Sequence, residues 1–160
     1  MNEPKELIEF FTEKAEQLVL KDGIRLSKDV ECWKQLRKLW HAVYRVFGTE
    51  LEDSSLAYIY AYCLPPEDSD SIASNTDGLS NKYVEQSNRY KISTIGICET
   101  CLRKEEDYQI FVMLHEFAHV LSDDNGGDVS SHGKQFQETL DDLIERYNEA
   151  TGSEIINYDD

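Results

Sequence analysis

Apolar positions recur with helical spacing in two segments near the start of the chain. In residues 4–20 they fall every three or four residues along one face. In residues 27–48 a second apolar stripe follows, with Ser27 in place to cap the helix and Gly48 in place to end it. The pattern therefore predicts two amphipathic helices within residues 1–48.

The pattern changes to that of strands in the middle of the chain. Residues 56–63, LAYIYAYC, are rich in aromatic residues that favour strands. The segments KYVEQ and RYKIS flank Ser87 and Asn88 like the two arms of a hairpin. Residues 65–81 are polar and interrupted by glycine and proline, which is typical of an exposed loop. We predict about three strands within residues 56–98, forming a small and mostly antiparallel sheet.

Helical spacing returns in the last third of the chain, in residues 105–122 and 131–150. An acidic tail, residues 151–160, follows these helices. The order of two helices, three strands and two helices is typical of an α+β fold. We therefore expect a single domain over residues 1–160, in which the sheet packs on helices.

The composition fits an acidic globular domain with its own core. The chain has 160 residues, 40% of them hydrophobic, and its 16 Lys and Arg against 32 Asp and Glu give a formal net charge of −16. A chain of this size buries enough apolar surface to fold by itself. Affinity for nucleic acid rests on Lys and Arg that displace counterions, so this charge disfavours direct binding to DNA or RNA. The acidic surface is instead expected to suit a protein partner.

The sequence also bears on location. No apolar run approaches the roughly 18 residues of a membrane-spanning helix. The first residues are acidic and lack the basic and apolar regions of a signal peptide. We therefore expect an intracellular, cytoplasmic protein without a membrane segment, and a nuclear location stays open.

The four cysteines are expected to be reduced thiols in such a location. Cys98 and Cys101 have the CxxC spacing of half a zinc knuckle or of a redox pair, but a knuckle needs two further ligands and only the isolated Cys32 and Cys63 are available. Buried or partly exposed thiols are the simpler interpretation. A second hypothesis makes one of the pair an inhibitory ligand of a metal near the helix that follows.

The residues that indicate a metal site form an HExxH motif in the predicted helix at 105–122: His115, Glu116 and His119. Residues four apart on a helix lie one turn from each other, so both imidazoles can reach one Zn²⁺. Glu116 lies about 100° round the helix and can hold an activated water without binding the metal. The flanking residues are apolar nearly all round, which predicts a central helix whose buried polar side chains need partners. The alternative is a core helix whose histidines bond to backbone or acidic neighbours.

A catalytic zinc takes a third protein ligand and keeps one position open. His132 and Glu138 are the two main candidates in residues 105–150. On the predicted last helix Phe136 marks the apolar face; at about 100° per residue, His132 falls about 40° from Phe136 and Glu138 about 200° away. We therefore expect His132 as the third ligand and Glu138 turned to solvent. The weaker candidates are aspartates of the intervening turn: Asp123, Asp124 and Asp128.

The segment HEFAHVLS, followed by a short loop and HGKQF, resembles the SprT-like and WLM zinc metalloproteases from residue 110 to about residue 147. The resemblance implies a zincin-like fold and an enzyme that hydrolyses peptide bonds. It further implies that one zinc is bound by His115, His119 and His132 and that Glu116 is the general base. It also implies that residues 91–98, the strand before the motif helix, lie beside the cleft as the edge to which an extended peptide adds.

Gly96 in that strand marks either the close approach of another backbone or a bend. Many members of these families act on proteins crosslinked to DNA, and this chain has no basic tract for such contacts. Two alternatives to a general protease therefore stay open. One is a DNA-associated protease that a partner delivers; the other is a non-catalytic zinc-binding interaction module.

Overall fold

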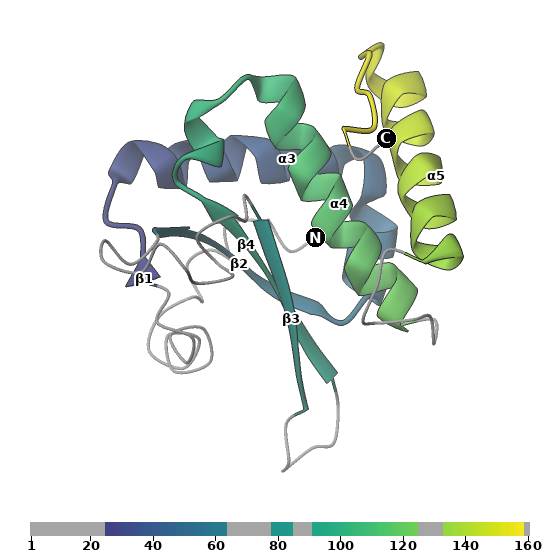
Figure 1. The fold of residues 1–160 in the computed structure, drawn as a ribbon, viewed down its shortest axis with the longest axis horizontal. Coiled ribbons are helices and arrows are strands. Elements are labelled where there is room, and N and C mark those ends of the chain that lie inside the picture. Colours follow the sequence, from purple (N-terminus) through teal and green to yellow (C-terminus); the bar gives the residue numbers. More distant parts are fainter. Residues whose placement is uncertain (1–24, 64–77, 85–90, 125–132, 159–160) are drawn as a thin grey trace.

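The computed structural model describes residues 25–63, 78–84, 91–124 and 133–158. The elements in chain order are β1 (Arg25–Leu26), α3 (Val30–Asp53), β2 (Leu56–Cys63), β3 (Gly78–Val84), β4 (Lys91–Cys98), a short 3-10 helix η3 (Cys101–Arg103), α4 (Glu106–Asp124) and α5 (Lys134–Thr151). The three long helices lie on one side of the sheet (Figure 1). This arrangement confirms the α+β class. The predicted helix at 4–20 lies outside the described residues.

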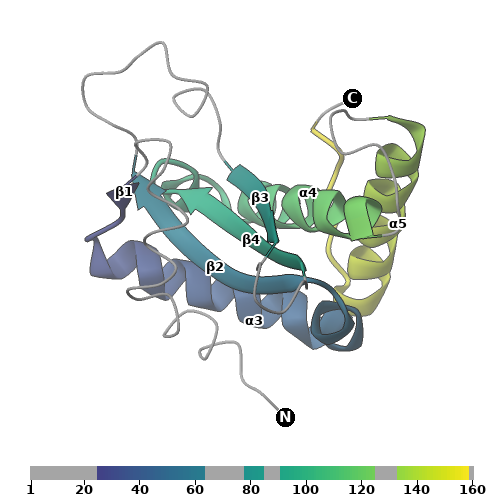
Figure 2. The same cartoon turned by 90° about the horizontal axis from the view of Figure 1, so that it is seen from below.

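The four strands form one mixed sheet in the order β1-β2-β4-β3. Its central pair, β2 and β4, is parallel, and β1 and β3 pair antiparallel on the two outer sides. Figure 2 shows the curved sheet from below, with α3 along β2 and α4 beyond β3 and β4. The strand before the motif helix, β4, is therefore an inner strand. The expectation that it forms the edge is wrong, because both of its sides carry hydrogen-bonded neighbours; the edge next to α4 is β3.

Gly96 in β4 is a point of close approach, but to a side chain of the same sheet. Its Cα partner in β2 is Tyr60, and a Cβ at Gly96 would lie 2.4 Å from two ring carbons of Tyr60. The β2–β4 register shows no shift at this position, so Gly96 is not a bulge. The glycine leaves room for an aromatic ring that crosses the neighbouring strand.

Two strands have the predicted bounds and the third does not. Strands β2 and β4 cover residues 56–63 and 91–98, the two ranges that were predicted. Strand β3 begins at Gly78, inside the segment predicted as a loop, and it pairs with β4 from Gly78 opposite Ile97 to Val84 opposite Lys91. Pairing with an apolar neighbour outweighs the weak strand preference of the residues GLSN.

The bounds of α3 also differ from the prediction. Asp29 is the N-cap, and its carboxylate accepts a backbone hydrogen bond of the first turn at 3.0 Å. Ser27 is instead buried, and its hydroxyl donates a hydrogen bond to the Glu99 carboxylate at 2.6 Å. Helical structure continues past Gly48 to Asp53, with a kink at Phe47 (φ −115°, ψ 21°), and the apolar stripe reaches the buried Leu51. A glycine without a left-handed backbone does not end a helix.

Helix α4 occupies the centre of the domain. It contacts β3, β4, α3 and α5. Eight of its apolar residues are at most 5% exposed: Ile110, Phe111, Val112, Met113, Leu114, Phe117, Ala118 and Val120. This confirms that the motif helix is central, as its nearly continuous apolar surface predicts. Among the described helices, none combines the length and apolarity needed to cross a membrane.

Candidate metal centre

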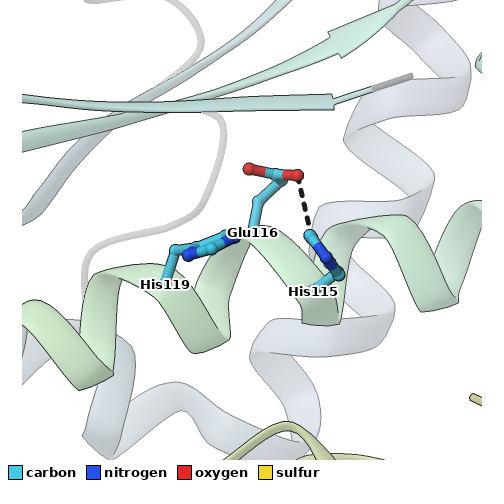
Figure 3. A group of neighbouring side chains, drawn as sticks. All are labelled: His115, Glu116 and His119. Atoms are coloured by element: carbon cyan, nitrogen blue, oxygen red, sulfur yellow. Dashed lines mark hydrogen bonds and ion pairs between the residues drawn. The ribbon is translucent and has the colours of Figure 1, made fainter. Parts of the chain in front are cut away.

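Helix α4 brings His115, Glu116 and His119 into one cluster. Each residue offers a ligand atom, and these atoms lie within 4.8 Å of one another. Figure 3 shows the two imidazoles one turn apart on α4, with the Glu116 carboxylate rising from the same stretch of helix toward the strands. The local cause is helical geometry, since residues at i and i+4 share a face. The clustering predicted from the HExxH spacing is therefore present in the fold.

The cluster lies at the boundary between the core and the surface. Glu116 is 6% exposed, whereas the side chain of His115 is 15% exposed and His119 is half-buried. His115 Nδ1 lies 3.1 Å from Glu116 Oε2. A buried carboxylate is costly without a polar partner, and this contact supplies one. The partly exposed imidazoles leave a route by which an ion can enter.

Edge strand β3 lies directly over Glu116, and Gly78 makes this approach possible. A Cβ at Gly78 would lie 2.8 Å from Val112 Cγ1, 3.0 Å from Glu116 Cγ and 3.1 Å from Glu116 Oε2. Real Cβ atoms do not approach side-chain atoms as closely as the first of these distances, so a side chain at position 78 would displace Val112 or the strand and would press on the Glu116 carboxylate. Sequence reasoning missed Gly78 because it placed this residue in a loop. A glycine that begins a strand is the available signal, because it often marks close packing.

The candidates for the third ligand fall into three groups. His132 and Asp128 lie outside the described residues. Asp123 and Asp124 are the last two residues of α4. Glu138 lies on α5 with a 68% exposed side chain, 3.9 Å from Lys134, and it does not join the cluster. Glu138 thus faces solvent, and His132 stays a prediction.

The thiols lie apart from the cluster. None of the four cysteines forms a disulfide, and Cys98 and Cys101 are buried. Cys98 accepts a hydrogen bond from the Thr100 hydroxyl at 3.2 Å. Burial, together with the nearby Asp29 carboxylate, raises the pKa of the Cys32 thiol to about 11. Neither Cys98 nor Cys101 belongs to the group of ligand atoms on α4, so the described geometry gives no support to an inhibitory thiolate.

The donor set of the cluster suits a transition-metal ion. Two neutral imidazole nitrogens are characteristic ligands of Zn²⁺, and an adjacent carboxylate can accept a proton from a water at such a site. Ions that prefer oxygen ligands, such as Mg²⁺ and Ca²⁺, fit this set poorly.

Comparison with protein-family models, curated proteins and solved structures found no match to this chain.

Proposed function

We propose that this protein is a zinc-dependent metallopeptidase with a zincin-like fold, in which His115 and His119 bind the metal. The observation that carries the proposal is the cluster of two imidazoles and one carboxylate within 4.8 Å on a central helix. His132 completes the ligand set in this proposal, because HGKQF brings the chain into α5 and α5 packs on α4. Three protein ligands would leave a bound zinc one position for water or substrate.

Glu116 is the general base of the proposed reaction. Zinc, when bound, supplies a Lewis acid that makes a water nucleophilic at neutral pH. Glu116 accepts the proton of the attacking water and passes it to the amine that leaves. Its burial beneath β3 keeps this proton transfer out of bulk solvent, and its 3.1 Å contact with His115 Nδ1 fixes the carboxylate beside the ligands.

The proposed substrate is an extended polypeptide that adds to strand β3. In the described part of the sheet, β3 pairs on one side only, with β4. A strand added to its other side takes its affinity from backbone hydrogen bonds and passes beside Glu116, which contacts β3 at Gly78. This role replaces the one that the sequence had suggested for β4.

The test of this proposal is the metal content of histidine variants. We expect the purified protein to contain one zinc per chain by plasma mass spectrometry and to hydrolyse casein. His115→Ala, His119→Ala and His132→Ala should each lose both zinc and activity because each removes a ligand. His41→Ala is the matched control, since His41 is exposed on α3 and should keep both properties.

Four results would contradict the proposal or part of it. Absence of zinc from the parent protein, or zinc retained in both His115→Ala and His119→Ala, would rule out the metal site. Zinc without hydrolysis of free or DNA-bound protein would favour the non-catalytic interaction module. Hydrolysis of DNA-bound protein alone would favour a protease that a partner delivers to DNA.

Gly78→Ala should lower the rate of hydrolysis without removing the metal. The added methyl group meets Val112 and Glu116, so we expect the general base to shift and kcat to fall about tenfold. Zinc content and kcat are measured together. Gly48→Ala is the control, because its Cβ would meet the Tyr44 ring at an ordinary 3.4 Å. An unchanged kcat in Gly78→Ala would show that β3 does not position Glu116.

A further inference from the structure

Phe136 lies against both histidines of the candidate metal centre. Its ring stacks on the His119 ring, with centroids 4.2 Å apart and planes at 26°. The same ring meets His115 edge-on, at 5.1 Å and 73°. The two imidazoles are themselves 5.0 Å apart at 76°. One side chain of α5 thus contacts both rings that are proposed to bind zinc.

The position of Phe136 is fixed by the packing of α5. Phe136 is 2% exposed and lies in the first turn of the helix, after the N-cap Gly133. The buried face of α5 continues from Phe136 through four further residues: Leu140, Leu143, Ile144 and Tyr147. A ring at the start of such a face has little freedom to move, because packed interiors leave few voids.

A fixed aromatic ring restricts the rotation of the imidazoles. The terminal torsion of a histidine side chain is broad, so a half-buried histidine on a helix samples several ring orientations. Zinc requires that the ring nitrogens of both histidines point at one position. In many metal sites a neighbouring group holds the ligand rings in that orientation, and its loss typically weakens metal binding by about 10- to 100-fold.

We propose that Phe136 is a positioning residue of the metal site, whose ring holds His115 and His119 in the geometry that binds zinc. This inference rests on the proposed function, because it assumes that the two histidines are zinc ligands. It assigns to Phe136 a role beyond its place in the apolar face of α5. Phe136 acts on the metal only through the two imidazoles.

The experiment measures zinc affinity, by competition with a chromophoric chelator, in variants that lack the ring. Phe136→Leu and Phe136→Met keep an apolar side chain, and we expect each to bind zinc about tenfold more weakly than the parent protein. Leu140→Ala is the matched control: it also removes buried volume, one turn further along the same face. It should lower the melting temperature while leaving zinc affinity within about twofold.

Two spectroscopic readouts separate positioning from general stability. Cobalt substituted for zinc should show an altered visible spectrum in Phe136→Leu and an unaltered one in Leu140→Ala, because the spectrum reports ligand geometry. In the unsubstituted protein, the ring protons of His119 should be shifted upfield by the stacked Phe136 ring. This NMR measurement needs no variant, so it decides the stacking even where the ring-lacking variants fail to fold.

The outcomes distinguish the inference from the proposed function. Parent-like zinc affinity in folded Phe136→Leu, or His119 protons without an upfield shift, overturns the role of Phe136 alone. A parent protein that binds no zinc overturns both proposals. Zinc binding that weakens in Phe136→Leu without any peptide hydrolysis supports the role of Phe136 and overturns the peptidase.

Discussion

Glu116→Gln should remove nearly all peptide hydrolysis while the protein keeps its zinc. Glutamine has nearly the same shape as glutamate, so it fits the buried space beneath β3 at Gly78. Its amide cannot accept the proton of the attacking water. Loss of a general base typically costs about 10²- to 10⁴-fold in rate, and we expect kcat to fall within this range. Casein hydrolysis and zinc content of the same preparation provide the measurement.

The matched control for this variant is Glu106→Gln. Glu106 lies in the first turn of the same helix, with a 51% exposed side chain 3.3 Å from Lys38. Exposed ion pairs of this kind contribute little to stability, so activity and zinc content should stay at the parent level. If Glu116→Gln retained its zinc and more than about a tenth of the activity, Glu116 would not be the general base.

Local sequence signals predicted the elements that pack most tightly. The aromatic-rich run LAYIYAYC predicts the bounds of β2, and the hairpin arm RYKIS together with its place before the motif helix predicts β4. The motif helix is central because its surface is apolar nearly all round. By contrast, the ends of α3 depend on competing caps, and either Ser27 or Asp29 could have capped it; Ser27 is instead used in a long-range bond to Glu99.

The order of the strands in the sheet could not be predicted from the sequence, because it depends on contacts between distant segments. The hairpin of β3 and β4 was predicted, but the parallel placement of β2 on the other side of β4 leaves no local trace in the sequence. That placement decides which strand forms the edge beside α4. The proposed substrate strand therefore moves from residues 91–98 to Gly78–Val84.

The residues of the candidate site also divide into those that the sequence predicts and those that only the fold reveals. His115, Glu116 and His119 lie within five consecutive residues of one helix, so their clustering follows from helical geometry alone. Gly78 and Phe136 reach the site from other elements, and only the packing of β3 and α5 on α4 reveals them. His132 remains a prediction of the sequence pattern.

Gly96→Ala should destabilise the fold more than any other glycine substitution considered above. The added Cβ would lie 2.4 Å from two ring carbons of Tyr60 and 2.6 Å from its hydroxyl oxygen. Tyr60 is fully buried and packs against Tyr62, with ring centroids 6.0 Å apart, and a ring in a packed interior has little room to move. Overpacking of this kind typically costs about 1–3 kcal/mol, and we expect the upper end.

Thermal and denaturant unfolding of a double-mutant cycle test the cause of this loss. A cost of about 3 kcal/mol should lower the melting temperature by roughly 10 °C in a chain of this length. Tyr60→Leu removes the ring that the new methyl group meets, although it is destabilising by itself because it leaves a cavity. Adding Gly96→Ala to Tyr60→Leu should therefore cost at least about 1 kcal/mol less than adding it to the parent protein. Additive effects would show that the loss arises from backbone conformation at residue 96, and not from contact with the Tyr60 ring.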